Sequence, residues 1–189
     1  MIKDYYRQIA DYINQEIEIL RKLDQNAINE VMNVLEEARE RGAKIYICGN
    51  GGSAATASHF VCDFNKGVSQ KKDKKYQFVC LNDNVPSIMA IANDHGYDQV
   101  FLMQIEEKIK PGDILFCISG SGNSKNIVVA AEYAKSKGAK IIGATGFDGG
   151  ALYKLADYHL HVPIDDMQIT EDVHLIFDHL IMRILAYGN

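Results

Sequence analysis

The chain has 189 residues, of which 47% are hydrophobic and 24% charged, a composition typical of one globular domain with a hydrophobic core. Its net charge of −5 indicates no nucleic-acid partner, and the lysines at 71–75 are expected in a solvated loop. No apolar stretch reaches the ~18 residues of a membrane span, and the charged, amphipathic N-terminus is unlike a signal peptide. The four cysteines form no CxxC pair and are expected to be reduced and buried, so we predict a cytoplasmic protein that contacts no membrane.

Two amphipathic helices are predicted at the start of the chain, over residues 2–21 and 25–41. Each places apolar residues at helical spacing, which produces an apolar stripe that must be buried. The sequence leaves open whether the stripes pack on the chain's own core or on another subunit. Our prediction is that residues 1–42 form a helical pair used in oligomer packing.

The rest of the chain alternates short apolar runs with glycine-rich turns and helices. The predicted strands cover residues 44–49, 77–81, 113–119, 140–146 and 158–162, and a long helix closes the chain over 168–187. Near-continuous apolar strands that alternate with helices indicate a parallel sheet covered on both faces. We therefore predict a single α/β domain over residues 1–189, with a five-stranded, flavodoxin-like parallel sheet flanked by helices.

Two Gly/Ser-rich turns follow predicted strands and open predicted helices: Gly-Asn-Gly-Gly-Ser at 49–53 and Ser-Gly-Ser-Gly-Asn-Ser at 119–124. Parallel sheets bind ligands at the carboxyl ends of their strands, and helix N-termini offer free N–H groups to an anion. Neither turn has the Gly-Lys-Ser/Thr of a P-loop, so a sugar monophosphate fits better than a nucleoside triphosphate. Two alternatives remain. The turns are ordinary turns with serine N-caps, or the GxGxxA pattern at 49–54 binds a dinucleotide, although Asp83 lies about 30 residues on rather than about 20.

A second group of polar residues combines histidines with carboxylates. His59 and Asp63 stand four positions apart on one predicted helix and therefore share a face. Glu171 and His179 are eight positions apart on the closing helix, about 12 Å, so they share an ion only by reaching toward each other or by coming from different subunits. Two imidazoles and two carboxylates suit a divalent ion such as zinc. The alternative is structural, with His59 bonded to Asp63 and with Asp178 solvating its helix.

Five short motifs resemble the sugar isomerase (SIS) family, and its phosphoheptose isomerase branch in particular. They are Cys-Gly-Asn-Gly-Gly-Ser (48–53), His-x-x-x-acid (59–63), Ala-Asn-Asp-x-Gly-Tyr (92–97), Ile-Ser-x-Ser-Gly-Asn-Ser (118–124) and Thr-Gly-x-Asp-Gly-Gly (145–150). The resemblance covers nearly the whole chain. It implies conversion of sedoheptulose 7-phosphate to an aldoheptose phosphate by a homotetramer whose active sites lie between subunits.

The same resemblance implies roles for individual residues. The substrate-binding positions fall on Asn50, Gly51, Gly52, Ser53, Asn93, Asp94, Ser119, Gly120, Ser121, Ser124 and Glu171. The zinc ligands fall on His59, Asp63, Glu171 and His179, and the catalytic residues on Asp63 and His179.

Four positions depart from the family's usual pattern. Asp63 stands in place of glutamate, Glu171 of glutamine, Gly120 of threonine and Gly67 of a substrate-binding arginine, with Lys66 the nearest cation. The shorter Asp63 puts its reach to the substrate carbons in doubt, whereas Glu171 adds a charge that favours a divalent ion. Both residues keep metal-ligand chemistry, which favours a variant enzyme over an inactive scaffold.

Aldose–ketose exchange moves a proton between C1 and C2 through an enediol, which requires a base, an acid and a group that stabilises the oxyanion. Our hypothesis makes Asp63 the base and His179 its acid/base partner, with the reverse split as the alternative, and zinc polarises the carbonyl. Three other functions are weighed against it: a non-catalytic SIS scaffold that binds a partner protein, an isomerase of another sugar phosphate, and a sugar-phosphate sensor, which would normally carry an added DNA-binding domain.

Overall fold

Five parallel strands form one sheet in the computed structural model, which describes residues 3–188. They are β1 (Ile45–Gly49), β2 (Phe78–Cys80), β3 (Ile114–Ser119), β4 (Lys140–Thr145) and β5 (Tyr158–His161). The strand order is β2-β1-β3-β4-β5, and every neighbouring pair runs parallel. The predicted α/β class and all five predicted strands are confirmed. The strands form where they were predicted because each apolar run is bounded by the glycines, prolines and polar residues that end a strand.

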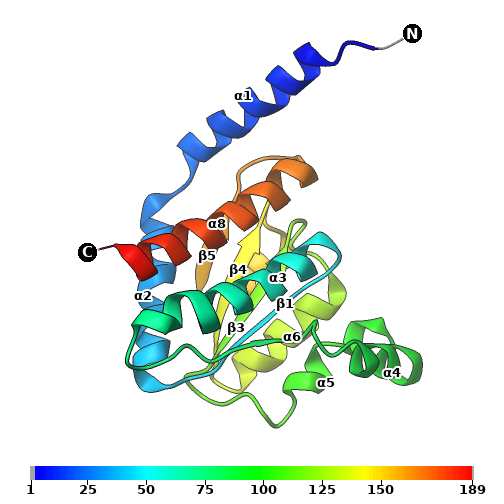
Figure 1. Ribbon diagram of the computed structural model, residues 1–189. Coiled ribbons are helices and arrows are strands. Elements are labelled where there is room, and N and C mark those ends of the chain that lie inside the picture. The colour runs from blue at the N-terminus through cyan, green and yellow to red at the C-terminus, as the bar shows by residue number, and fades with distance from the viewer. Residues whose placement is uncertain (1–2, 189) are drawn as a thin grey trace.

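The helices of the described residues connect these strands and flank the sheet (Figure 1). They are α1 (Tyr6–Lys22), α2 (Gln25–Arg41), α3 (Gly52–Cys62), α4 (Val85–His95), α5 (Leu102–Ile105), α6 (Lys125–Ser136), α7 (Gly150–Leu155) and α8 (Met167–Tyr187). The π-helical segment η1 (Asp63–Val68) continues α3, and two 3-10 segments follow, η2 (Ser69–Lys71) and η3 (Tyr97–Gln99). Within residues 3–188, no helix has both the length and the apolar character that crossing a membrane requires.

The core consists of two apolar layers, one on each face of the sheet. Successive side chains of a strand point to opposite faces. Ile45 and Ile47 of β1 therefore pack in the layer that includes α2, α3 and α8, whereas Tyr46 and Cys48 pack in the layer that includes α5, α6 and α7. As a result, α3 and α8 lie together on one face, at a place where their polar side chains can meet.

The two N-terminal helices behave differently. Val31 and Leu35 of α2 are fully buried in the core of the chain itself. On α1, by contrast, the apolar side chains of Ile9, Ile13 and Ile17 are 57%, 51% and 40% exposed. Figure 1 shows α1 projecting away from the sheet. The apolar stripe of α2 is therefore buried within the chain, whereas most of the apolar stripe of α1 is exposed.

The cysteines differ in exposure more than the sequence suggests. Cys48 and Cys117 are buried, Cys80 is half-buried, and all four thiols are free. Cys62 is exposed, so the expectation of buried thiols is wrong at this position. Cys62 is the last residue of α3 and is not among the buried residues of that helix, which the short apolar run around it does not reveal.

His174 is a buried histidine of α8 and gives the protein an expected acid sensitivity. Its Nε2 lies 3.3 Å from the carbonyl oxygen of Thr145 at the end of β4, and burial lowers its pKa from 6.5 to about 4. Between pH 6.5 and 4 the unfolded chain therefore binds a proton that the folded chain rejects, so acidification destabilises the fold. The difference in pKa corresponds to roughly 3 kcal/mol.

We expect the free energy of unfolding to fall in both the wild type and His174→Gln as the pH is lowered from 6.5 to 4. The fall should be larger in the wild type, by roughly 3 kcal/mol. Urea denaturation at several pH values measures both slopes, and groups common to the two proteins cancel in the comparison. Equal slopes would show that His174 is not held neutral in the fold.

Candidate active site

Two Gly/Ser-rich loops meet at the carboxyl edge of the sheet. The first joins β1 to α3 and the second joins β3 to α6. Because β1 and β3 are neighbours, with Gly49 paired to Ile118, the two loops lie side by side. The chain moves to β2 on one side of β1 and then returns to β3 on the other, so this edge is the switch point at which such sheets bind ligands.

A cavity of about 160 Å³ lies between these loops and the start of α8. It is lined by Asn50, Ser53, Ile118, Ser119, Gly120, Ser121, Ser124, Met167 and Glu171. The four serines among the predicted substrate-binding residues thus share one cavity with Asn50, Gly120 and Glu171. We name it the phosphate cavity, after the group that the sequence predicts it to bind. Hydroxyl groups and helix N-termini that converge in this way are suited to an anion.

The serine hydroxyls are not engaged as helix caps. Ser124 is the N-cap residue of α6, but its side chain makes no capping hydrogen bond, and the N-cap of α3 is Gly51. Instead the hydroxyl of Ser119 donates to the hydroxyl of Ser124 at 3.3 Å, and Ser119 itself is buried. The interpretation of these loops as ordinary turns capped by serine therefore loses its main support.

Glycine at position 52 lets the side chain of Glu171 on α8 approach the first loop closely. A Cβ atom added to Gly52 would clash with the carboxylate of Glu171. Glu171 thus lies directly over the N-terminus of α3, where the helix dipole favours a negative charge. This contact explains why Glu171 lines the phosphate cavity.

Two of the departures from the family pattern face methionines of α8. A Cβ atom at Gly120 would lie 2.6 Å from Sδ of Met167, and one at Gly67 would lie 3.1 Å from Cε of Met182. Met167 also lines the phosphate cavity. The space that a larger side chain would need at 120 is therefore filled by a methionine here.

A network of side-chain amides, which the sequence analysis did not predict, joins the two loops. The side-chain amides of Asn50 and Asn126 exchange two hydrogen bonds, of 3.0 and 2.9 Å. The hydroxyl of Tyr97 donates to Oδ1 of Asn50 at 2.8 Å. The side chain of Asn82 both accepts from and donates to the backbone of Gly49. These contacts fix the position of the first loop relative to the second.

Asn93 and Asp94 are not brought to this cavity within the chain. Both are exposed near the end of α4, where the amide of Asn93 donates to the carboxylate of Asp94 at 2.8 Å. Neither residue lines the cavity between the loops. Their predicted substrate contacts therefore require another subunit or a movement of α4.

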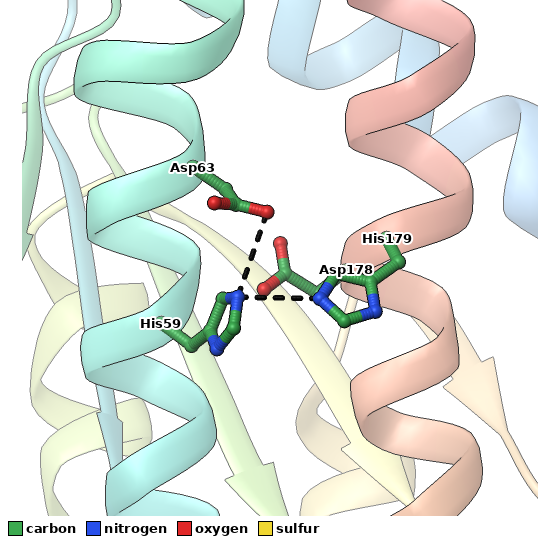
Figure 2. A group of neighbouring side chains, drawn as sticks. All are labelled: His59, Asp63, Asp178 and His179. Carbon is green, nitrogen blue, oxygen red and sulfur yellow. Dashed lines mark hydrogen bonds and ion pairs between the residues drawn. The ribbon is translucent and has the colours of Figure 1, made fainter.

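A second polar group lies further along α3, η1 and α8. His59, Asp63, Asp178 and His179 bring one ligand atom each to within 4.8 Å of one another (Figure 2). The Nε2 atoms of His59 and His179 are 3.2 Å apart, and Nε2 of His59 is 3.6 Å from a carboxylate oxygen of Asp63. The group borders a cavity of about 620 Å³ that is also lined by Met182, Arg183 and Tyr187.

The predicted fourth member of this group, Glu171, is not part of it within the chain. Glu171 precedes His179 by two helical turns and lies at the phosphate cavity instead. Asp178 takes the fourth place, and it is fully buried rather than solvated as the alternative interpretation held. Burial first, and the charge of Asp63 second, raises the pKa of Asp178 to about 8.

The four side chains fit a divalent metal ion. Two ligands bonded to a tetrahedral ion at 2.0–2.2 Å lie about 3.3–3.6 Å from each other. The separations of 3.2 Å between His59 and His179 and 3.6 Å between His59 and Asp63 are close to these values, and the ligand atoms of all four residues lie within 4.8 Å of one another. Two imidazoles and two carboxylates also form a donor set that borderline ions such as zinc accept.

The sequence is similar to known proteins over most of its length. Residues 4–146 match the SIS domain family. A phosphoheptose isomerase of Aliarcobacter butzleri is 38% identical over 161 residues, which cover 85% of each chain. A probable phosphoheptose isomerase of Thermoplasma acidophilum is 37% identical over 174 residues, which cover 92% of this chain and 95% of the other.

Solved structures agree with these relatives. The fold is similar to that of the phosphoheptose isomerase of Francisella tularensis, with a TM-score of 0.89 and 28% identity over 97% of this chain and 99% of the other. It is also similar to the phosphoheptose isomerase of Neisseria gonorrhoeae, with a TM-score of 0.88 and 27% identity over 96% and 98% of the two chains.

Proposed function

The chain belongs to the phosphoheptose isomerase family of SIS-domain proteins, and on this basis we propose that it interconverts sedoheptulose 7-phosphate and an aldoheptose 7-phosphate. The observation that carries the proposal is the combination of two sites on α3 and α8. A hydroxyl-lined cavity lies near the beginning of both helices, and a histidine–carboxylate group lies two to three turns further along. From Ser53 to His59 is about 9 Å along a helix, a separation that an extended seven-carbon chain with its phosphate can span.

The phosphate end of the substrate is proposed to bind in the cavity between the loops. Ser53, Ser119, Ser121 and Ser124 offer hydroxyl donors, and the N-termini of α3 and α6 add backbone N–H groups. Asn50 and Glu171, which share this cavity, are proposed to bind sugar hydroxyl groups. The role of the cavity is to fix the far end of the sugar, which positions C1 and C2 at the second site.

The proton transfers are proposed to take place at Asp63 and His179. Asp63 removes a proton from C1 of the ketose and returns it to C2, while His179 donates a proton to O2 and accepts one from O1. His59 lies beside both groups, so its imidazole holds them in place. A divalent ion held by this group, which we propose to be zinc, would polarise the carbonyl and stabilise the charge that develops on its oxygen.

The exposed stripe of α1 supports an oligomer. Ile9, Ile13 and Ile17 expose apolar surface on one helix, and burial of such surface against a second copy is favourable. We propose that the protein forms a homo-oligomer, a tetramer, in which this surface of α1 is a subunit interface. In that assembly Asn93 and Asp94 would complete the site of another subunit. The location we propose for the protein is the cytoplasm, where its free thiols stay reduced.

One experiment tests the proposed function. Purified protein is incubated with sedoheptulose 7-phosphate, with and without a chelator, and aldose product is measured. We expect product that the chelator abolishes and added zinc restores. No product with any divalent ion would favour a non-catalytic scaffold that binds a partner protein. Product that forms equally well with the chelator would remove the metal from the mechanism but keep the isomerase.

A further inference from the structure

Asp178 is a buried carboxylate without a partner. The residue has no exposed surface, and neither of its carboxylate oxygens has a hydrogen-bond partner among the described residues. No lysine or arginine among residues 3–188 forms an ion pair with it. His59, Asp63 and His179 lie within ligand distance of it, with one ligand atom of each of the four residues within 4.8 Å of the others, and Figure 2 shows its side chain among them.

An unpaired buried charge is costly, so a carboxylate in this position needs either a proton or a cation. Apolar side chains would be the default for the buried face of α8, which carries Ile169, Val173, Phe177 and Ile181, and Asp178 is the one carboxylate among its buried residues, beside the polar Thr170 and His174. A carboxylate there gains nothing from packing. Its position beside two imidazoles and a second carboxylate, with one ligand atom of each residue within 4.8 Å of the others, points to a cation.

We propose that Asp178, rather than Glu171, is the fourth protein ligand of the divalent ion held by His59, Asp63 and His179. The inference rests on the proposed function, whose metal site it deepens. The four ligands then come from α3, η1 and α8 of a single chain, so the site forms without a neighbouring subunit. Two carboxylates also balance the charge of a divalent ion, which the family's usual pairing of one carboxylate with glutamine does not.

The position of Glu171 supports this exchange of roles. Its carboxylate lies against Gly52 at the start of α3 and lines the phosphate cavity. His179 is about 12 Å further along the same helix. Glu171 is therefore free to act on the substrate side, as a hydrogen-bond acceptor for sugar hydroxyl groups.

The test compares Asp178→Asn with Glu171→Gln, two substitutions on α8 that each remove one charge and keep the side-chain volume. Zinc affinity is measured by calorimetry, and the geometry of the site by the visible absorption of bound Co²⁺. We expect Asp178→Asn to weaken zinc binding by more than the ~10–100-fold that loss of a supporting partner costs, and to change the Co²⁺ spectrum. Glu171→Gln should leave both unchanged.

Thermal melting supplies a second readout. Substitution of a purely structural residue would lower the melting temperature with and without metal, whereas substitution of a metal ligand should change only the effect of the metal. Without metal, Asp178→Asn should melt no lower than the wild type, because asparagine cannot carry the unpaired buried charge that the aspartate acquires when it ionises. With zinc, the rise in melting temperature should be smaller than in the wild type, because the variant binds the ion more weakly.

Three results would overturn the inference: retained zinc affinity in Asp178→Asn, loss of zinc affinity in Glu171→Gln, or no zinc binding by the wild type. Sedoheptulose 7-phosphate turnover is measured separately. A wild type that binds zinc through Asp178 but forms no aldose overturns the proposed function and leaves this inference standing.

Discussion

Alanine in place of Asp63 or His179 should lower kcat by about 10²–10⁴-fold, the contribution that general acid–base catalysis typically makes. Both side chains lie beside His59 at the wall of the larger cavity. The phosphate cavity is lined by other side chains. The KM for the sugar phosphate should therefore change much less than kcat, since positioning of the phosphate survives.

Initial rates with sedoheptulose 7-phosphate give both constants, and circular dichroism checks that each variant is folded. Two matched controls should keep normal kcat: Asp73→Ala, in an exposed loop, and His159→Ala on β5, whose ring stacks on Tyr153. The zinc content of each variant separates a lost ligand from a lost proton transfer. Near-normal turnover of both alanine variants at Asp63 and His179 would reject the assignment.

The fold was predictable because its signals are local. Each strand is a short apolar run, and each helix carries an apolar stripe at the helical period, so neither depends on distant parts of the chain. The π-helical turn that begins at Asp63 was not predictable, because the residues of η1 continue the pattern of α3 without a break. The exposure of α1 was not predictable either. Its apolar stripe has the same spacing as that of α2, although of the two helices only α2 buries its stripe in the core.

The phosphate cavity was predictable for a similar reason. Its serines occur in two contiguous motifs, and neighbouring strands bring such motifs together at one edge. The pairing of Asn50 with Asn126 was not predictable, since it joins residues 76 positions apart and nothing in the sequence near Asn126 distinguishes it.

Asp178 shows the strongest limit of sequence reasoning. A carboxylate on a helix is usually exposed, which is why solvation was the simplest interpretation of it. Its burial follows from the packing of α8 on α3 and η1, and that packing depends on contacts more than a hundred residues apart. The family pattern, carried over position by position, placed Glu171 in the ligand set instead. The sequence predicts a donor set of two imidazoles and two carboxylates, and the structure contains a group of that composition, with Asp178 where the prediction has Glu171.

The phosphate cavity gives the second large expected effect. The double substitution Ser53→Ala/Ser124→Ala removes one hydroxyl from each loop and leaves both backbones intact. A hydrogen bond to a charged group contributes about 1.5–3 kcal/mol, so two of them should lower kcat/KM by about 10²–10⁴-fold. Because Ser124 does not cap α6 and Ser53 lies within α3, we expect no loss of fold.

The same variant should distinguish phosphate binding from a general role of the loops. Unphosphorylated sedoheptulose lacks the group that the hydroxyls hold, so the wild type and the variant should convert it equally slowly. Ser136→Ala is the matched control, because its hydroxyl bonds to the carbonyl of Tyr133 at the far end of α6. If the double variant loses the same factor with both sugars, these hydroxyls support the loops rather than bind the phosphate. If it loses activity only with the phosphorylated sugar, the binding energy of the phosphate is what positions C1 and C2 for the proton transfers at Asp63 and His179.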